Sequence, residues 1–261
     1  MESFSLLNTL RFKILFITTV GKMINKKIQI YREIGDETGF VEYVQHMGSD
    51  LTIVNSARVS FGKHKQHIDD KDKKLIKYLI QHKHTSTLEH NILTLRFKVP
   101  LFVRSQHHRH RTWSYNEISR RYTDENLEFY DPKVFRTQHS SNRQASNLDR
   151  INPDIEVTHP ESTTTYKVLA TKRVMNHNWD CVALFDDLID AGICREQARG
   201  VLPQSLYTEY YGTCNLNNLI KFIKLRTHEG AQWEIQQVAK AIQLIAKEIW
   251  PITMNALESQ K

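Results

Sequence analysis

The sequence predicts an α+β fold, in which a small and mainly antiparallel sheet is flanked by helices, with a long C-terminal helix. Residues 93–99 alternate apolar and polar side chains before Pro100, a pattern typical of a strand with one buried face. Residues 69–82 and 235–249 instead repeat apolar side chains every three or four positions, as amphipathic helices do. Strands and helices do not alternate regularly, which disfavours a parallel sheet built from βαβ units.

The first half of the chain predicts helical segments around that strand. The apolar stripe of residues 69–82 consists of Leu75, Ile76, Leu79 and Ile80. The spacing of Ser86 and Glu89 matches a capping box, so a short helix is expected to begin there. Residues 101–113 also favour a helix, and an irregular polar stretch is expected from there to Tyr122.

Residues 131–160 are rich in Ser, Asn, Gln and Arg, contain three prolines and show no apolar periodicity. A loop of this length within a domain is typical of a functional lid or of a disordered segment. We expect it to fold over the functional site as a lid.

The second half of the chain predicts two further helices and a strand before the last helix. Residues 161–191 favour a helix that Gly192 ends. Its apolar positions include Leu169, Val182, Phe185, Leu188 and Ile189. Residues 206–213 are rich in Tyr and Thr and predict a strand, and Asn215 is placed to cap a helix that runs to Arg226. The last helix, 235–249, is expected to end at Pro251.

We expect a single domain over residues 30–261, preceded by a basic extension over residues 1–29. The first 29 residues hold one acid, Glu2, against Arg11, Lys13, Lys22, Lys26 and Lys27. A disordered tail and a start assigned upstream of the true one at Met23 both explain this composition. A targeting segment is disfavoured because no small-residue cleavage site is evident.

Composition excludes several classes of protein. The chain has 261 residues, 40% of them apolar, with nine Gly and six Pro, which is typical of a globular protein rather than a disordered or fibrous one. Cys181, Cys194 and Cys214 are widely spaced and predict neither a disulfide framework nor a zinc site, which favours a reducing, cytoplasmic compartment. The apolar run 14–21 is too short to cross a membrane. The net charge of +7 favours an anionic partner.

The basic side chains gather in residues 96–122, where seven Lys and Arg face the single acid Glu117. Three histidines lie among them, yet Arg109 and Arg111 would repel a cation, so we expect no metal. Guanidinium groups instead suit phosphate oxygens. A solvated basic helix face or a nucleic-acid-binding stripe would show the same composition. No Gly-rich dinucleotide motif or P-loop occurs in the sequence.

The string Arg109-His-Arg-Thr-Trp-Ser-Tyr-Asn-Glu-Ile-Ser-Arg-Arg-Tyr122 resembles the R-H-R-x-x-S-x-N-E-x-S-x-R-Y signature of the flavin-dependent thymidylate synthase family. Four other segments agree in order and spacing: Ser56-Ala-Arg-Val-Ser-Phe61, His82-x-His-x-Ser-x-x-Glu-His90, Arg199-x-x-Leu-Pro203, and Leu225-Arg226 followed by Ala231-Gln-Trp-Glu-Ile235. The resemblance covers residues 38–252.

The resemblance implies an enzyme that converts dUMP to dTMP. The carbon donor would be 5,10-methylenetetrahydrofolate, the hydride carrier FAD and the reductant NADPH, in a homotetramer whose active sites are shared between subunits. It implies no metal, nucleic-acid or membrane partner. No cysteine of this chain lies in a matching motif, so a cysteine nucleophile is not expected. Arg226 matches the arginine that would stabilise the deprotonated uracil ring, and Ser119 matches a serine that we expect to position the base.

The resemblance also implies the binding residues. The expected dUMP residues are Gln106, His107, His108, Arg109, Glu117, Ile118, Ser119, Arg120, Arg121, Arg199 and Arg226. The expected FAD residues are Ser60, Ser86, Glu89, Arg109, His110, Arg111, Thr112, Glu117, Asn215, Asn217 and Lys221. The catalytic pair would be Arg226 and Ser119.

Structural roles compete with several of these assignments. Ser86 and Asn215 could cap helices, and His107 and His108 favour packing or hydrogen bonding over catalysis. Cys214 is expected to be a small buried apolar residue.

Three positions depart from the family pattern on the expected FAD side. Asn217 and Lys221 stand where many members have arginine and asparagine, and Gly230 stands where many have histidine. We expect Lys221 to supply positive charge toward the FAD pyrophosphate. Two other classes of function stay open: a nucleic-acid-binding protein that uses residues 96–122, and a structural oligomer joined through helix 235–249.

Overall fold

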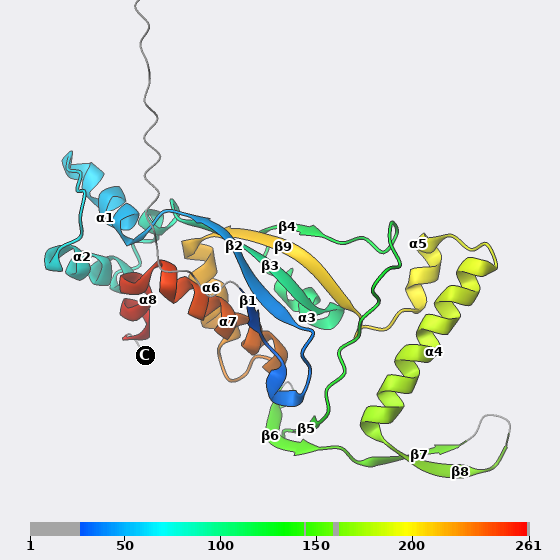
Figure 1. Cartoon of the computed structure of the whole chain (residues 1–261). Coiled ribbons are helices and arrows are strands. Elements are labelled where there is room, and N and C mark those ends of the chain that lie inside the picture. Colours follow the sequence, from blue (N-terminus) through cyan, green and yellow to red (C-terminus); the bar gives the residue numbers. More distant parts are fainter. Residues whose placement is uncertain (1–26, 144, 159–161, 260–261) are drawn as a thin grey trace, which may run out of the picture.

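A five-stranded antiparallel sheet forms the centre of the protein (Figure 1). The computed structural model describes residues 27–143, 145–158 and 162–259. In sheet order the strands are β1 (Lys27–Gln29), β2 (Phe40–Met47), β3 (Ile92–Pro100), β9 (Tyr207–Asn215) and β4 (Ser114–Glu117). The predicted α+β class and the strands at 93–99 and 206–213 are confirmed. The sheet already includes Lys27–Gln29, while the rest of the expected basic extension lies outside the described residues.

The central strand β3 has one apolar and one polar face, as its alternation predicts. Leu93, Leu95, Phe97 and Val99 are fully buried. On the opposite face Arg96 pairs with Glu42 on β2 and Glu209 on β9, and Lys98 pairs with Glu128. Both cations of the basic segment therefore form ion pairs, and those of Arg96 join neighbouring strands.

Three helices cover the apolar face of the sheet: α3 (Leu101–His107), α6 (Leu216–Arg226) and α7 (Trp233–Ile249) (Figure 1). Asn215 caps α6 by accepting from the Asn218 amide at 3.0 Å, as expected. The predicted last helix is confirmed as α7, but a further helix, α8 (Pro251–Glu258), follows it. Pro251 begins α8 because the first position of a helix needs no amide hydrogen.

Two helices, α1 (Asp50–Arg58) and α2 (Asp70–Gln81), pack beside α8 at the end of the sheet (Figure 1). The predicted helix at 69–82 is confirmed, and Asp69 caps it through the Asp72 amide at 3.0 Å. Short 3₁₀ turns follow each helix, η2 (Val59–Phe61) and η3 (Thr85–Leu88), and a third, η1 (Arg32–Ile34), lies between β1 and β2.

Two expectations in this half of the chain are wrong. Ser86 does not cap a helix, because it lies inside the 3₁₀ turn η3, which starts one residue earlier and is followed by β3. The helix expected over 101–113 ends at His107, and the polar stretch after it contains the edge strand β4, which pairs with β9.

Residues 131–158 are not an irregular loop. They contain β5 (Phe135–Gln138), which pairs with β6 (Ser146–Ile151), and β7 (Asp154–Thr158), which pairs with β8 (Thr165–Leu169). Cross-strand pairing was missed because both faces of these strands are largely polar and exposed.

The helix expected from residue 161 therefore begins later, at α4 (Ala170–Asp190), with Leu169 still in β8. Gly192 ends it with a φ of 86°, as expected. The chain then forms α5 (Arg195–Ala198) and the turn η4 (Arg199–Val201), which pack with α4 at a distance from α1, α2 and α8 (Figure 1). No helix in the described residues is long and apolar enough to span a membrane.

Candidate active site

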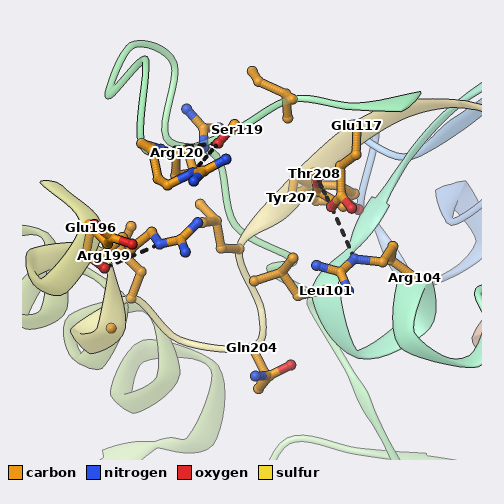
Figure 2. A pocket seen from close by; sticks show the side chains of 15 residues that line it. Leu101, Arg104, Glu117, Ser119, Arg120, Glu196, Arg199, Gln204, Tyr207 and Thr208 are labelled. Atoms are coloured by element: carbon orange, nitrogen blue, oxygen red, sulfur yellow. Dashed lines mark hydrogen bonds and ion pairs between the residues drawn. The ribbon is translucent and has the colours of Figure 1, made fainter. Parts of the chain in front are cut away.

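A cavity of about 690 Å³ lies between the end of β4 and the α5–η4 turn (Figure 2). Its lining comprises Leu101, Arg104, Glu117, Ile118, Ser119, Arg120, Arg121, Glu196, Arg199, Gly200, Leu202, Gln204, Leu206, Tyr207 and Thr208. The structure thus brings together Arg199 and the run 117–121, two sets of expected dUMP residues that lie about eighty positions apart. None of the described residues in 131–158 lines the cavity, so within this chain that segment is not a lid over it.

The cavity has an excess of positive charge. Four arginines line it against Glu117 and Glu196. Within the described residues, Arg120, Arg121 and Arg199 form no ion pair with a carboxylate, and Arg199 donates only to the Glu196 carbonyl oxygen at 3.3 Å. The Nε atom of Arg120 is buried without an acceptor in the described part of the chain. Such guanidinium groups are suited to bind an oxyanion.

The Glu117 carboxylate is held in place from two elements. Its Oε1 accepts from Arg104 Nε on α3 at 3.0 Å and from Thr208 Oγ1 on β9 at 2.6 Å (Figure 2). Both donors use the same oxygen, so Oε2 remains available for a ligand hydroxyl or N–H group. Arg104 balances the charge of Glu117 and is only 31% exposed at its side chain.

Ser119 lies at the cavity but has no base to activate it. Its Oγ is within 3.4 Å of the Arg121 amide and of Arg121 Nε, which both donate to it. No His, Asp or Glu side chain among the described residues bonds to this hydroxyl. The arrangement favours a positioning role over nucleophilic attack.

A second group of expected site residues lies where α3 meets the end of α6. Arg226 donates from Nε to Nε2 of His110 at 3.1 Å and from Nη2 to the Gln106 carbonyl oxygen at 3.1 Å. Burial lowers the pKa of Arg226, and burial followed by the nearby Arg226 charge lowers the pKa of His110. Neither Gln106 nor Arg226 lines the cavity of Figure 2.

The histidines of this segment have separate structural partners. His107 is fully buried, its Nδ1 lies 2.8 Å from the Tyr210 hydroxyl, and its Nε2 has no hydrogen-bond partner among the described residues. Burial lowers the pKa of His107 well below its usual value. His108 stacks on Tyr115 with ring centroids 4.0 Å apart. The described residues hold no cluster of His, Cys, Asp and Glu that could bind a metal.

The expected FAD residues form a dispersed set. Arg109, Arg111 and Thr112 are exposed in the turn between α3 and β4. Asn217 is buried at 5% exposure and donates to Glu89 at 2.9 Å, so two expected FAD residues bond to each other. Ser60, Ser86 and Lys221 are exposed, while Cys214 is buried as expected.

The sequence did not point to Arg104, Gln204, Tyr207 and Thr208 as cavity residues. Arg104 was visible only as one of seven cations. Its role depends on the proximity of α3, β4 and β9, which local patterns do not encode. A weak signal existed for Leu202, which lies inside the matched string Arg199-x-x-Leu-Pro203.

Residues 42–252 match the family described as thymidylate synthase complementing protein. The flavin-dependent thymidylate synthase of Thermus thermophilus is 40% identical over 222 residues, covering 85% of this chain and 76% of that protein. That of Thermotoga neapolitana is 40% identical over 221 residues, covering 84% of this chain and 91% of that protein.

Solved structures agree with the sequence match. The UMP/dUMP methylase PolB from Streptomyces cacaoi, bound with 5-Br UMP, aligns with a TM-score of 0.68 at 30% identity, covering 84% of this chain and 93% of that chain. Since the family match spans most of the sequence and the relatives cover most of both chains, this protein belongs to the flavin-dependent thymidylate synthase family.

Proposed function

We propose that the protein converts dUMP to dTMP, with 5,10-methylenetetrahydrofolate as carbon donor and NADPH-reduced FAD as hydride source. The observation that supports this most is the set of three arginines at the cavity without carboxylate partners. Arg120, Arg121 and Arg199 would bind the phosphate of dUMP. The free oxygen of Glu117 would accept from the ribose, and Ser119 would position the base.

Arg226 would stabilise negative charge on the uracil ring as C5 attacks the carbon donor. A guanidinium already desolvated by its surroundings interacts more strongly with such charge than one in water. No cysteine is required in this scheme, and Cys214 is enclosed by the core. FAD, when bound, supplies the hydride that reduces the transferred carbon.

The expected dUMP residues divide into a cavity group and a group around Arg226, which supports an active site shared between subunits of a homotetramer. In this arrangement the cavity of one subunit would face Gln106, Arg109 and Arg226 of another. The three unpaired thiols are compatible with a cytoplasmic location.

Arg109 and Arg111 are exposed and would bind the FAD pyrophosphate, and Ser60, Ser86, Glu89, Thr112 and Asn215 would make further contacts with FAD. Lys221 lies one helical turn beyond Asn217 and would supply the charge that Asn217 lacks. We expect Lys221→Ala to weaken FAD binding about ten-fold. Fluorescence titration measures this, with Lys224→Ala on the same helix as the control. Equal affinity in the two variants would exclude the role.

The whole proposal is tested on the purified protein. We expect a yellow protein, or one that takes up FAD, whose flavin spectrum changes on titration with dUMP. It should oxidise NADPH when dUMP is present and form dTMP when the folate is added. A protein that neither contains nor takes up FAD would contradict the proposal.

A further inference from the structure

The carboxylate of Glu234, in the first turn of α7, is buried at 4% exposure. Its Oε1 accepts from the Tyr130 hydroxyl at 2.9 Å and from Arg136 Nη2 at 2.7 Å. Its Oε2 accepts from Gln232 Nε2 at 2.9 Å. Arg136 and Glu234 thus form an ion pair, in which the carboxylate of Glu234 accepts all three hydrogen bonds.

An ionised carboxylate accepts hydrogen bonds and cannot donate them. Gln232 must therefore turn its NH₂ group toward Glu234, which leaves Oε1 of Gln232 on the other side. That oxygen accepts from Nε2 of Gln106. The charge of Glu234 thus decides which end of the Gln106 amide faces Gln232.

The main chain of Gln106 is fixed as well, because its carbonyl oxygen accepts from Arg226 Nη2 at 3.1 Å. Its side-chain Oε1 has no hydrogen-bond partner among the described residues. Gln106 lies in the last turn of α3, immediately before the buried His107. Hydrogen bonds therefore hold both the main chain and the side-chain NH₂ group of Gln106, and its Oε1 remains available as an acceptor.

We infer that Glu234 is a positioning residue that acts through Gln232, so that Gln106 presents an acceptor, Oε1, to a donor on dUMP. This rests on the proposed function, in which Gln106 is a dUMP residue. The donors of dUMP at neutral pH are its ribose 3′-hydroxyl and its uracil N3–H group. Glu234 itself lies behind Gln232 and does not touch the substrate.

The substitution Glu234→Gln tests this chain of hydrogen bonds, here called the relay, because it should reverse the orientation of the Gln232 and Gln106 amides. A Gln at position 234 turns its oxygen toward Tyr130 and Arg136 and its NH₂ toward Gln232. Gln232 and Gln106 must then both turn over, and Gln106 presents a donor where dUMP also has one. Equilibrium dialysis of the FAD-loaded enzyme should show dUMP binding weakened about ten-fold.

A double-mutant cycle separates this role from a merely structural one. Once Gln106→Ala has removed the amide, Glu234→Gln should change the Kd for dUMP by less than about two-fold. Equal losses in both backgrounds would overturn the inference. Asp50→Asn serves as the matched control, since Asp50 is also a buried carboxylate, bonded to Thr253 on α8, and should leave the Kd unchanged.

If Glu234→Gln does not fold, Gln232→Met breaks the hydrogen bonds between Glu234 and Gln106 without changing the ion pair, and the same double-mutant cycle applies.

Two dUMP analogues identify the donor on the substrate. The loss of affinity in Glu234→Gln should disappear for the 3′-deoxy compound or for the N3-methyl compound. A loss that persists with both would overturn the inference.

The two proposals can fail separately. A wild-type holoenzyme that does not bind dUMP refutes the proposed function. Normal dUMP binding with no effect of Gln106→Ala overturns the inference and leaves the function intact.

Discussion

The guanidinium of Arg226 donates to Nε2 of His110 at 3.1 Å, and this bond requires that Nε2 carry no proton. Burial lowers the pKa of His110 from its usual 6.5, so the acceptor persists below that pH and is lost as the pH falls through the lowered pKa. We expect kcat/KM for dUMP to fall at acid pH with a midpoint below 6.5. In His110→Gln, where the acceptor does not titrate, this acid limb should flatten. An unchanged limb would show that another group causes it.

His107 should make stability depend on pH. Its folded-state pKa lies well below the usual 6.5 because of burial, whereas the unfolded chain takes up a proton near 6.5. Above that pH the group is neutral in both states and contributes no pH dependence. As the pH falls below it, the free energy of unfolding should decrease by about 1.4 kcal/mol per pH unit until the folded pKa is reached. Urea unfolding at several pH values should show this slope reduced in His107→Gln and retained in the exposed control His67→Gln.

The carboxylate of Asp72 anchors α2 to α1. It is fully buried, accepts from Arg58 Nε at 3.0 Å and pairs with Lys65 at 2.6 Å, and these contacts hold its pKa far below the usual range against the effect of burial. Asp72→Asn should lower the free energy of unfolding by about 3 kcal/mol, because it breaks the buried pairs. Asp70→Asn, which removes an exposed pair with Lys73, should cost less than about 1 kcal/mol. Similar losses in the two variants would contradict the burial argument.

Arg199 should bind the substrate phosphate. Replacing it by Ala removes charge-assisted hydrogen bonds, and calorimetric titration should show dUMP binding weakened roughly ten- to a hundred-fold. Deoxyuridine, which has no phosphate, should lose much less affinity. Arg173→Ala on the exposed surface of α4 makes the same change in net charge and should leave both affinities unaltered. An equal loss for dUMP and deoxyuridine would place Arg199 away from the phosphate.

Sequence periodicity predicted the elements that bury one face. The strand around Phe97 and the helices around Ile76 and Ile242 each contribute a stripe of buried side chains, and local sequence patterns reveal such stripes. The strand β4 was missed because its pairing with β9 is a contact between residues about a hundred positions apart. Residues 165–169 were mistaken for helix, although their Thr, Tyr and Val content favours a strand.

The candidate site likewise contains residues that the sequence predicted and residues that depend on contacts between distant segments. The motif pointed to Glu117 and Arg199 because the resemblance carries information from many related chains. It did not point to Arg104 or Thr208, whose contacts with Glu117 exist only once α3, β4 and β9 are assembled. The charges of Arg96 and Lys98 are likewise balanced by ion pairs with Glu42 and Glu128, so the number of cations in the basic segment overstates its available positive charge.

Arg136 connects the polar segment 131–158 to the interior of the domain. The composition of this segment alone would suggest an insertion that the fold does not need. Arg136 lies on β5, yet it neutralises the buried Glu234 at 2.7 Å and lies over the Trp233 ring at 4.8 Å. Engineering a shorter chain could therefore trim the exposed turn around residues 140–143 but would have to retain β5. Deleting the whole β5–β6 hairpin would leave the buried carboxylate of Glu234 without its cationic partner.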